Sequence, residues 1–303
     1  DGGPGTGKTS IIKELQKLDV CSFDFSKLSP GISPLWKHKT PEEKTLIHTP
    51  PSAWFPTDDD KVFFKKVIYR GAGSPKIMVY YERGGKKYEL KLKMGLEVHT
   101  DIIVSRLAEF VGLNQDRMLY KKVVRVYLGD TSYEEFRAAF VNKYGMQSLR
   151  RLIWAYDDKA PEPWVEFNDV LYEARPEEEK RVCIMDFGSW DLQNRREFRS
   201  LLLFWGWVGL NDTKLENFKY LFHQEENGSL TPLYRYQDTG IAFGGEMNLR
   251  KVNNILSFAQ YYKINAFPDS FLHVNKKEIK IFWNDFANRK TLFTTTTYND
   301  LRW

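Results

Sequence analysis

Cysteine is scarce in this chain of 303 residues, which contains only Cys21 and Cys183. Two cysteines exclude a framework of several disulfides, such as holds small secreted domains together, and they exclude a zinc site built from cysteines. The fold must therefore be stabilised by a hydrophobic core. A chain of this length provides for one large domain or two modest ones.

The sequence also has no apolar run that would cross a membrane as a helix. The longest, LLLFWGWVGL at residues 201–210, has about half of the ~20 residues that a spanning helix requires. Residues 1–20 lack the basic and then apolar pattern of a signal sequence. We therefore expect no membrane span and a cytoplasmic location.

A strong excess of one charge is missing as well. The chain has 45 Lys and Arg against 40 Asp and Glu, a net charge of +5. Its basic pairs, Lys65/Lys66 and Lys121/Lys122 among them, are scattered instead of clustered. A nucleic-acid partner usually requires a concentrated basic surface. We therefore expect no nucleic-acid partner.

Changes in composition and in residue pattern along the chain predict three parts. Residues 1–56 form an N-terminal arm with a linker rich in Pro, Ser and Thr. Residues 57–130 carry strand patterns and one amphipathic helix, and they include a hairpin whose turn is Gly84-Gly85. Residues 131–303 are expected to be mainly helical, with a Pro-rich interval at 159–167 between two of the helices.

The first residues hold one candidate nucleotide site. GGPGTGKT at residues 2–9 matches the phosphate-binding pattern GxxxxGK[ST], and residues 2–18 resemble the start of an AAA-type ATPase. Gly7 and Lys8 would then hold phosphates and Thr9 would bind Mg²⁺. The doubly wound βαβ pattern that normally carries this loop does not follow, so a P-loop ATPase or nucleotide kinase is the alternative interpretation.

A second candidate site begins at the predicted hairpin. Lys91 and Lys93 lie two residues apart on a strand, and therefore on one face of it. The helix that follows offers Glu97 and Asp101 at a spacing of i, i+4, on one side. Phosphoryl transfer uses such a lysine to bind the nucleotide's phosphates and such an acid to position the lysine.

The later residues of this site follow in the order that phosphoryl transfer requires. Asn217 comes five residues after Asp212, which is the D-x-x-x-x-N spacing of a kinase catalytic loop. Asp238 precedes Thr-Gly, directly after an expected strand. Asp212 would orient or deprotonate an acceptor hydroxyl, while Asn217 and Asp238 would hold Mg²⁺.

These motifs resemble those of HipA-type serine/threonine kinases and related HipA/phosphoinositide-kinase-like bacterial proteins. The likeness rests on KLKMGLEVHTDIIVSRLAEFVGL (91–113), NDTKLEN (211–217) and DTGIAFG (238–244). It implies an α+β fold with two kinase-like lobes, a small β-rich N-lobe (57–130) with one helix and a larger, mainly helical C-lobe (131–303). It also implies ATP and Mg²⁺ as cofactors, Lys93 as the first phosphate ligand with Lys91 as the second, and Asp101 in place of the family's lysine-pairing glutamate.

Three functions are consistent with these patterns. The first is an ATP- and Mg²⁺-dependent phosphotransferase of HipA-like type, which acts on a protein serine or threonine or on a small-molecule hydroxyl. The second is the P-loop enzyme that would use Lys8 and Thr9. The third is a catalytically weak pseudokinase that serves as a binding module.

Overall fold

The chain is described in a computed structural model. The residues that it describes are 20–21, 36–45, 54–69, 74–95, 97–176, 178–185, 196–208, 210, 217–224, 228–240, 242, 272–274, 279–285 and 290–296. The chain divides into two compact units. We call residues 48–103 and 116–176 the barrel unit, and residues 1–47, 104–115 and 177–303 the sheet unit.

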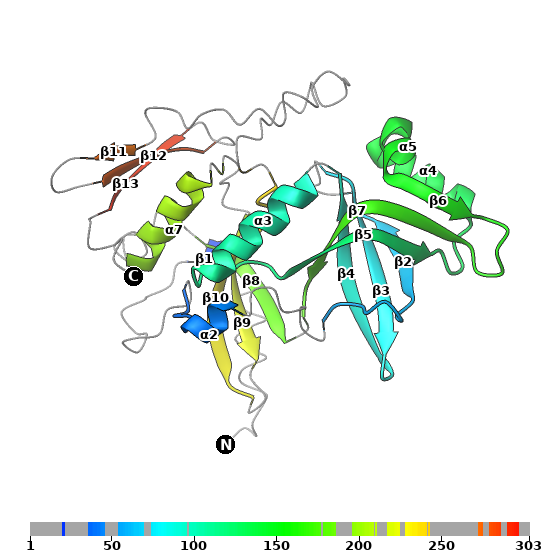
Figure 1. The fold of residues 1–303 in the computed structure, drawn as a ribbon, viewed down its shortest axis with the longest axis horizontal. Coiled ribbons are helices and arrows are strands. Elements are labelled where there is room, and N and C mark those ends of the chain that lie inside the picture. The colour runs from blue at the N-terminus through cyan, green and yellow to red at the C-terminus, as the bar shows by residue number, and fades with distance from the viewer. Residues whose placement is uncertain are drawn as a thin grey trace. The chain divides into compact units, whose positions relative to one another are not determined.

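The barrel unit is built mostly from strands (Figure 1). Its elements are β2 (Val62–Val67), β3 (Lys76–Arg83), β4 (Lys86–Met94), the first half of α3 (Glu97–Phe110), β5 (Met118–Tyr127), α4 (Tyr133–Tyr144), α5 (Met146–Leu152), β6 (Ile153–Asp157) and β7 (Trp164–Ala174). The β3–β4 hairpin turns at Gly84 and Gly85, which both have positive φ, as the sequence predicts.

Five of these strands close into a barrel. The ladder runs β4-β3-β2-β5-β7, and a further pairing between β4 and β7 joins its two ends. β7 makes closure possible because it changes partner along one edge: it pairs with β6 through Trp164–Phe167 and with β4 through Val170–Ala174. Asp169, which has a φ of 48°, lies between the two stretches. β6 is left outside the ring as the end strand of the sheet.

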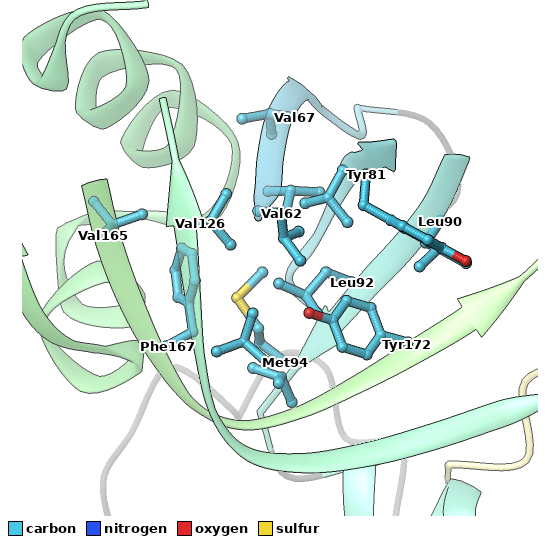
Figure 2. Close-up of a cluster of buried hydrophobic side chains, with 14 of the residues drawn as sticks. Val62, Val67, Tyr81, Leu90, Leu92, Met94, Val126, Val165, Phe167 and Tyr172 are labelled. Atoms are coloured by element: carbon cyan, nitrogen blue, oxygen red, sulfur yellow. The ribbon is translucent and has the colours of Figure 1, made fainter. Parts of the chain in front are cut away.

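The barrel interior is filled with large side chains. Strand residues alternate between the two faces of a sheet, so one set from every strand points inward. Among the buried residues that Figure 2 draws, it labels Val62, Val67, Tyr81, Leu90, Leu92, Met94, Val126, Val165, Phe167 and Tyr172. Phe136 and Phe140 of α4 and Leu149 of α5 join the same core, so the two helices pack against the barrel.

The first half of α3 packs on the outside of the barrel. Val98 is completely buried against Met118 of β5 and Leu171 of β7, with Ile102 beside them. Tyr120 and Leu171 are paired across β5 and β7, so they share the outer face. This packing fixes which turn of α3 lies over the ends of β4 and β7.

The described part of the sheet unit contains two sheets and the helices α2 and α7 (Figure 1). Its elements are β1 (Val20–Cys21), α2 (Pro41–Thr45), the second half of α3, β8 (Glu179–Met185), α7 (Arg196–Trp207), β9 (Phe218–Gln224), β10 (Leu230–Tyr236), β11 (Leu272–Val274), β12 (Ile279–Asp285) and β13 (Lys290–Thr296). Strands β1-β8-β9-β10 form one sheet and β11-β12-β13 the other. Trp205 of α7, Val104 and Ala108 of α3, and Tyr220 and Tyr236 of the first sheet share one core.

The two-lobed kinase-like fold with a helical C-lobe is wrong. The structure has a closed barrel of five strands, and strands also dominate the described residues after 131. The helical structure expected after residue 131 is interrupted at Leu152, where α5 ends, and residues 153–157 are strand β6. The interval at 159–167 leads into β7, which closes the barrel. Pro161 and Pro163 both precede β7. The strand itself, WVEFNDVLYEA, contains no proline, and its β-branched and aromatic residues favour a strand.

None of the helices in the described part of the chain is long and apolar enough to cross a membrane.

Candidate functional site

Lys93 is a buried cation on the outer face of the barrel. Its neighbours Leu92 and Met94 point into the barrel core, so alternation places Lys93 outside, beneath α3. Its ammonium is 2.6 Å from a carboxylate oxygen of Glu97 and forms an ion pair with Asp101. Only 2% of the Lys93 side chain is exposed, and Asp101 is completely buried. The ammonium is therefore held between two carboxylates.

The local sequence explains how these carboxylates reach Lys93. β4 ends at Met94, and Gly95, with a φ of 96°, turns the chain into α3 at Glu97. Glu97 and Asp101 are one helical turn apart and so lie on the same side of α3. Packing of Val98 against the barrel fixes that side toward β4.

A second ion pair, which is partly buried, lies beside the first. Lys91 donates to a carboxylate oxygen of Glu173 on β7 at 2.7 Å, and the two residues are direct partners across the β4–β7 ladder. Burial lowers the pKa of Lys91, against the attraction of Glu173. Burial acts to raise the pKa of Glu173, but the charges of Lys91, Arg175 and Lys76 outweigh it and hold this pKa well below 4.5. Glu173 is therefore ionised at neutral pH.

Asn217 and Asp238 meet at one end of a hairpin in the sheet unit. β9 and β10 pair antiparallel, with Phe218 opposite Tyr236, so the residue before β9 and the residues after β10 lie together. The backbone N–H of Gln237 donates to the carbonyl of Asn217 at 2.8 Å. Asn217 is 3% exposed, and Asp238, with a φ of 65°, is half-buried. Asp238 therefore sits where the chain turns away from the hairpin.

Neighbouring side chains secure this hairpin end. Arg181 of β8 donates to the amide oxygen of Gln237 at 2.7 Å. Thr239 is completely buried, and its carbonyl accepts from the N–H of Ala242 at 3.0 Å. A polar end of this kind can present an amide and a carboxylate oxygen side by side, which is the ligand chemistry that Mg²⁺ prefers.

The sequence-predicted site residues thus fall into three groups. Lys91, Lys93, Glu97 and Asp101 lie together in the barrel unit, and Asn217 and Asp238 lie together in the sheet unit. Gly7, Lys8, Thr9 and Asp212 lie outside the described residues.

Sequence reasoning missed Glu173. Its contact with Lys91 joins residues 82 positions apart and exists only because β7 closes the barrel. The sequence feature that could have indicated Glu173 is the run WVEFNDVLYEA, in which apolar and polar residues partly alternate as in a strand. In a strand, Glu173 and Leu171 lie on the same face.

Comparisons with protein-family models, with curated proteins and with solved structures found no match to this chain.

Proposed function

We propose that the chain is an ATP- and Mg²⁺-dependent phosphotransferase that transfers the γ-phosphate to a hydroxyl acceptor, on a protein or a small molecule. The observation that carries the proposal is the buried ammonium of Lys93 between Asp101 and Glu97. Desolvation offsets most of the attraction within a buried ion pair, so stability alone is a weak reason for this arrangement. A lysine held in one orientation by acids on the next helix suits the binding of nucleotide phosphates.

In this proposal, Lys93 binds the α- and β-phosphates, and Lys91 adds positive charge beside it. Asp101 and Glu97 are positioning residues, because they fix the ammonium and do not touch the transferred group. Burial of Lys93 and Asp101 excludes water from the ammonium, which strengthens its attraction for phosphate.

Asp212, Asn217 and Asp238 complete the proposed set. Asn217 and Asp238 would hold Mg²⁺, and the amide and carboxylate oxygens that they offer fit its preference for oxygen ligands shared with phosphates. When bound, the metal ion supplies positive charge that offsets the charge developing on the phosphoryl group. Asp212 would orient the acceptor hydroxyl or accept its proton.

The main experiment compares two aspartates that both have positive φ, Asp238 and Asp169. Asparagine tolerates the left-handed region, so Asp238→Asn removes a carboxylate while the backbone is kept. We expect Asp238→Asn to abolish Mg²⁺-dependent ATP turnover, measured as nucleoside diphosphate release and as autophosphorylation by mass. Asp169→Asn, the matched control, should keep it. Full turnover by Asp238→Asn would refute the proposed role.

A second experiment tests the lysine. Isothermal titration with ATP and MgCl₂ should show binding to the unchanged chain and to Lys65→Met, in which an exposed ion pair with Glu89 is lost. Binding should be lost in Lys93→Met. Because this change leaves Asp101 and Glu97 without their cation, Lys93→Arg serves as a second variant that retains the charge. Binding by Lys93→Met equal to that of the unchanged chain would contradict the proposal.

The same measurements distinguish the two alternative functions. Loss of ATP binding in Lys8→Ala, together with retained binding in Lys93→Met, would favour the P-loop enzyme. ATP binding without turnover in the unchanged chain would favour a binding module that has no catalytic activity.

A further inference from the structure

One edge of β6, in the barrel unit, pairs with no strand in the described part of the chain. Closure pairs the five barrel strands with one another, and β6 is the end strand of the sheet, bonded to β7 alone among the described residues. Its outer edge therefore carries backbone N–H and C=O groups that no described strand covers. Such an edge is a template for pairing with another strand.

The exposed side chains of β6 are large and aromatic. Trp154 is 70% exposed and Tyr156 is 52% exposed, and Tyr156 stacks on Tyr133 of α4 with ring centroids 4.3 Å apart. Edges that avoid pairing commonly carry lysine or proline, and the strand IWAYD has neither. Besides the short length of the strand, the protective device here is a bulge between Ile153 and Ala155. It leaves Ala155–Asp157 in regular pairing with β7.

The charges around β6 indicate what pairs with this edge. The sequence from 150 to 158 reads RRLIWAYDD, with exposed Arg150 at the end of α5 and exposed Asp158 just after β6. A second β6 laid antiparallel reverses this order, so the end of α5 that carries Arg150 in one copy lies toward Asp158 of the other. A two-fold axis near the middle of the strand repeats the favourable contact twice.

We propose that β6 is a homodimer interface, at which two copies of this chain pair their edge strands antiparallel. This inference does not rest on the proposed function. Aromatic side chains bury about 150–250 Å² each, so the four from two copies bury at most about 600–1,000 Å². With the strands themselves, the interface is at the lower end of the usual size, and we expect a dissociation constant of about 1–100 μM.

The test uses sedimentation velocity on the 303-residue chain, from about 1 μM to about 200 μM. The unchanged chain should shift from monomer to dimer with concentration. Trp154→Ser should weaken the dimer at least tenfold. A chain that stays monomeric throughout would overturn the proposal and leave the edge to some other partner.

A charge exchange tests the pairing itself. Arg150→Glu places like charges opposite each other in its own dimer, and Asp158→Arg does the same with the opposite sign, so each variant alone should be monomeric. Their equimolar mixture restores opposite charges at both ends and should form a heterodimer. Both residues are exposed, and unchanged circular dichroism should show that the fold is kept. Dimers that persist in each single variant, or a mixture that stays monomeric, would refute antiparallel pairing through β6.

Discussion

Lys91 and Lys93 lie two residues apart on β4. The cost of removing each ammonium from water is offset by an ion pair with a carboxylate. Lys93 is served by the next helix, whereas Lys91 depends on Glu173 of β7. Glu173 is also within reach of Arg175, whose guanidinium is 3.1 Å from its carboxylate. One buried carboxylate thus balances several cations on the outer face of the barrel, and its removal has a large effect.

Glu173→Gln should lower the free energy of unfolding at pH 7 by about 3 kcal/mol, because it leaves Lys91, whose side chain is only 17% exposed, without its counter-charge. Urea denaturation measures this. Glu89→Gln is the matched control: Glu89 also pairs with a lysine, Lys65, but 42% of its side chain is exposed. The control should cost at most about 1 kcal/mol. Equal losses in the two variants would show that burial does not decide the strength of these pairs.

The same substitution predicts a pH dependence. The pKa of Glu173 in the folded chain lies well below 4.5, its ordinary value. Its ionised form therefore contributes stability that is present above pH 4.5 and is lost as the pH falls through the folded pKa. The difference in unfolding free energy between the unchanged chain and Glu173→Gln should shrink on acidification below pH 4.5. A difference that stays constant in this range would contradict the assignment.

Among the secondary-structure elements, those with local signals were predicted from the sequence. The β3–β4 hairpin and α3 are confirmed, because a Gly-Gly turn and a helical period are properties of neighbouring residues. The strands β6 and β7 were missed. IWAYD continues the helical pattern of α5, and the choice between helix and strand is decided by pairing with β7, which lies beyond the next loop.

In the candidate site, too, contacts between residues close in sequence could be predicted, whereas a contact made by long-range strand pairing could not. Lys93 and Asp101 are eight residues apart on consecutive elements, so their meeting follows from strand and helix geometry. Asn217 and Asp238 flank a hairpin, which brings their backbones together for the same reason. Glu173 reaches Lys91 only through barrel closure, and no local pattern near Lys91 indicates it.

The β3–β4 hairpin provides a test of the turn. Gly84 has a φ of 59°, and a Cβ added there meets nothing within 4 Å. The cost of Gly84→Ala must then come from the backbone, and we expect about 1–2 kcal/mol in urea denaturation. Asparagine tolerates positive φ, so Gly84→Asn should cost clearly less. Lys86→Ala, beside the turn, is the control and should have little effect. Equal costs for Ala and Asn would contradict this explanation.

At the scale of the whole molecule, the boundary between the two units falls inside the helix α3. Residues up to Ile103 belong to the barrel unit, and residues from Val104 belong to the sheet unit. Val98 packs in the barrel unit, while Val104 and Ala108 belong to the core of the sheet unit. We therefore expect a change in the middle of this helix to affect the stability of both cores.

Ile103 is the residue at which this link can be weakened without loss of core packing, because 49% of it is exposed. Ile103→Gly should cost about 1 kcal/mol more than the matched control Ile103→Ala, since glycine disfavours the helix. Hydrogen exchange followed by mass spectrometry should then show about fivefold faster exchange in β4 and in β9, one strand from each unit. The alanine variant should leave both strands close to the unchanged chain. Faster exchange in only one strand would show that the two halves of α3 respond independently, and that each core is stabilised without the other.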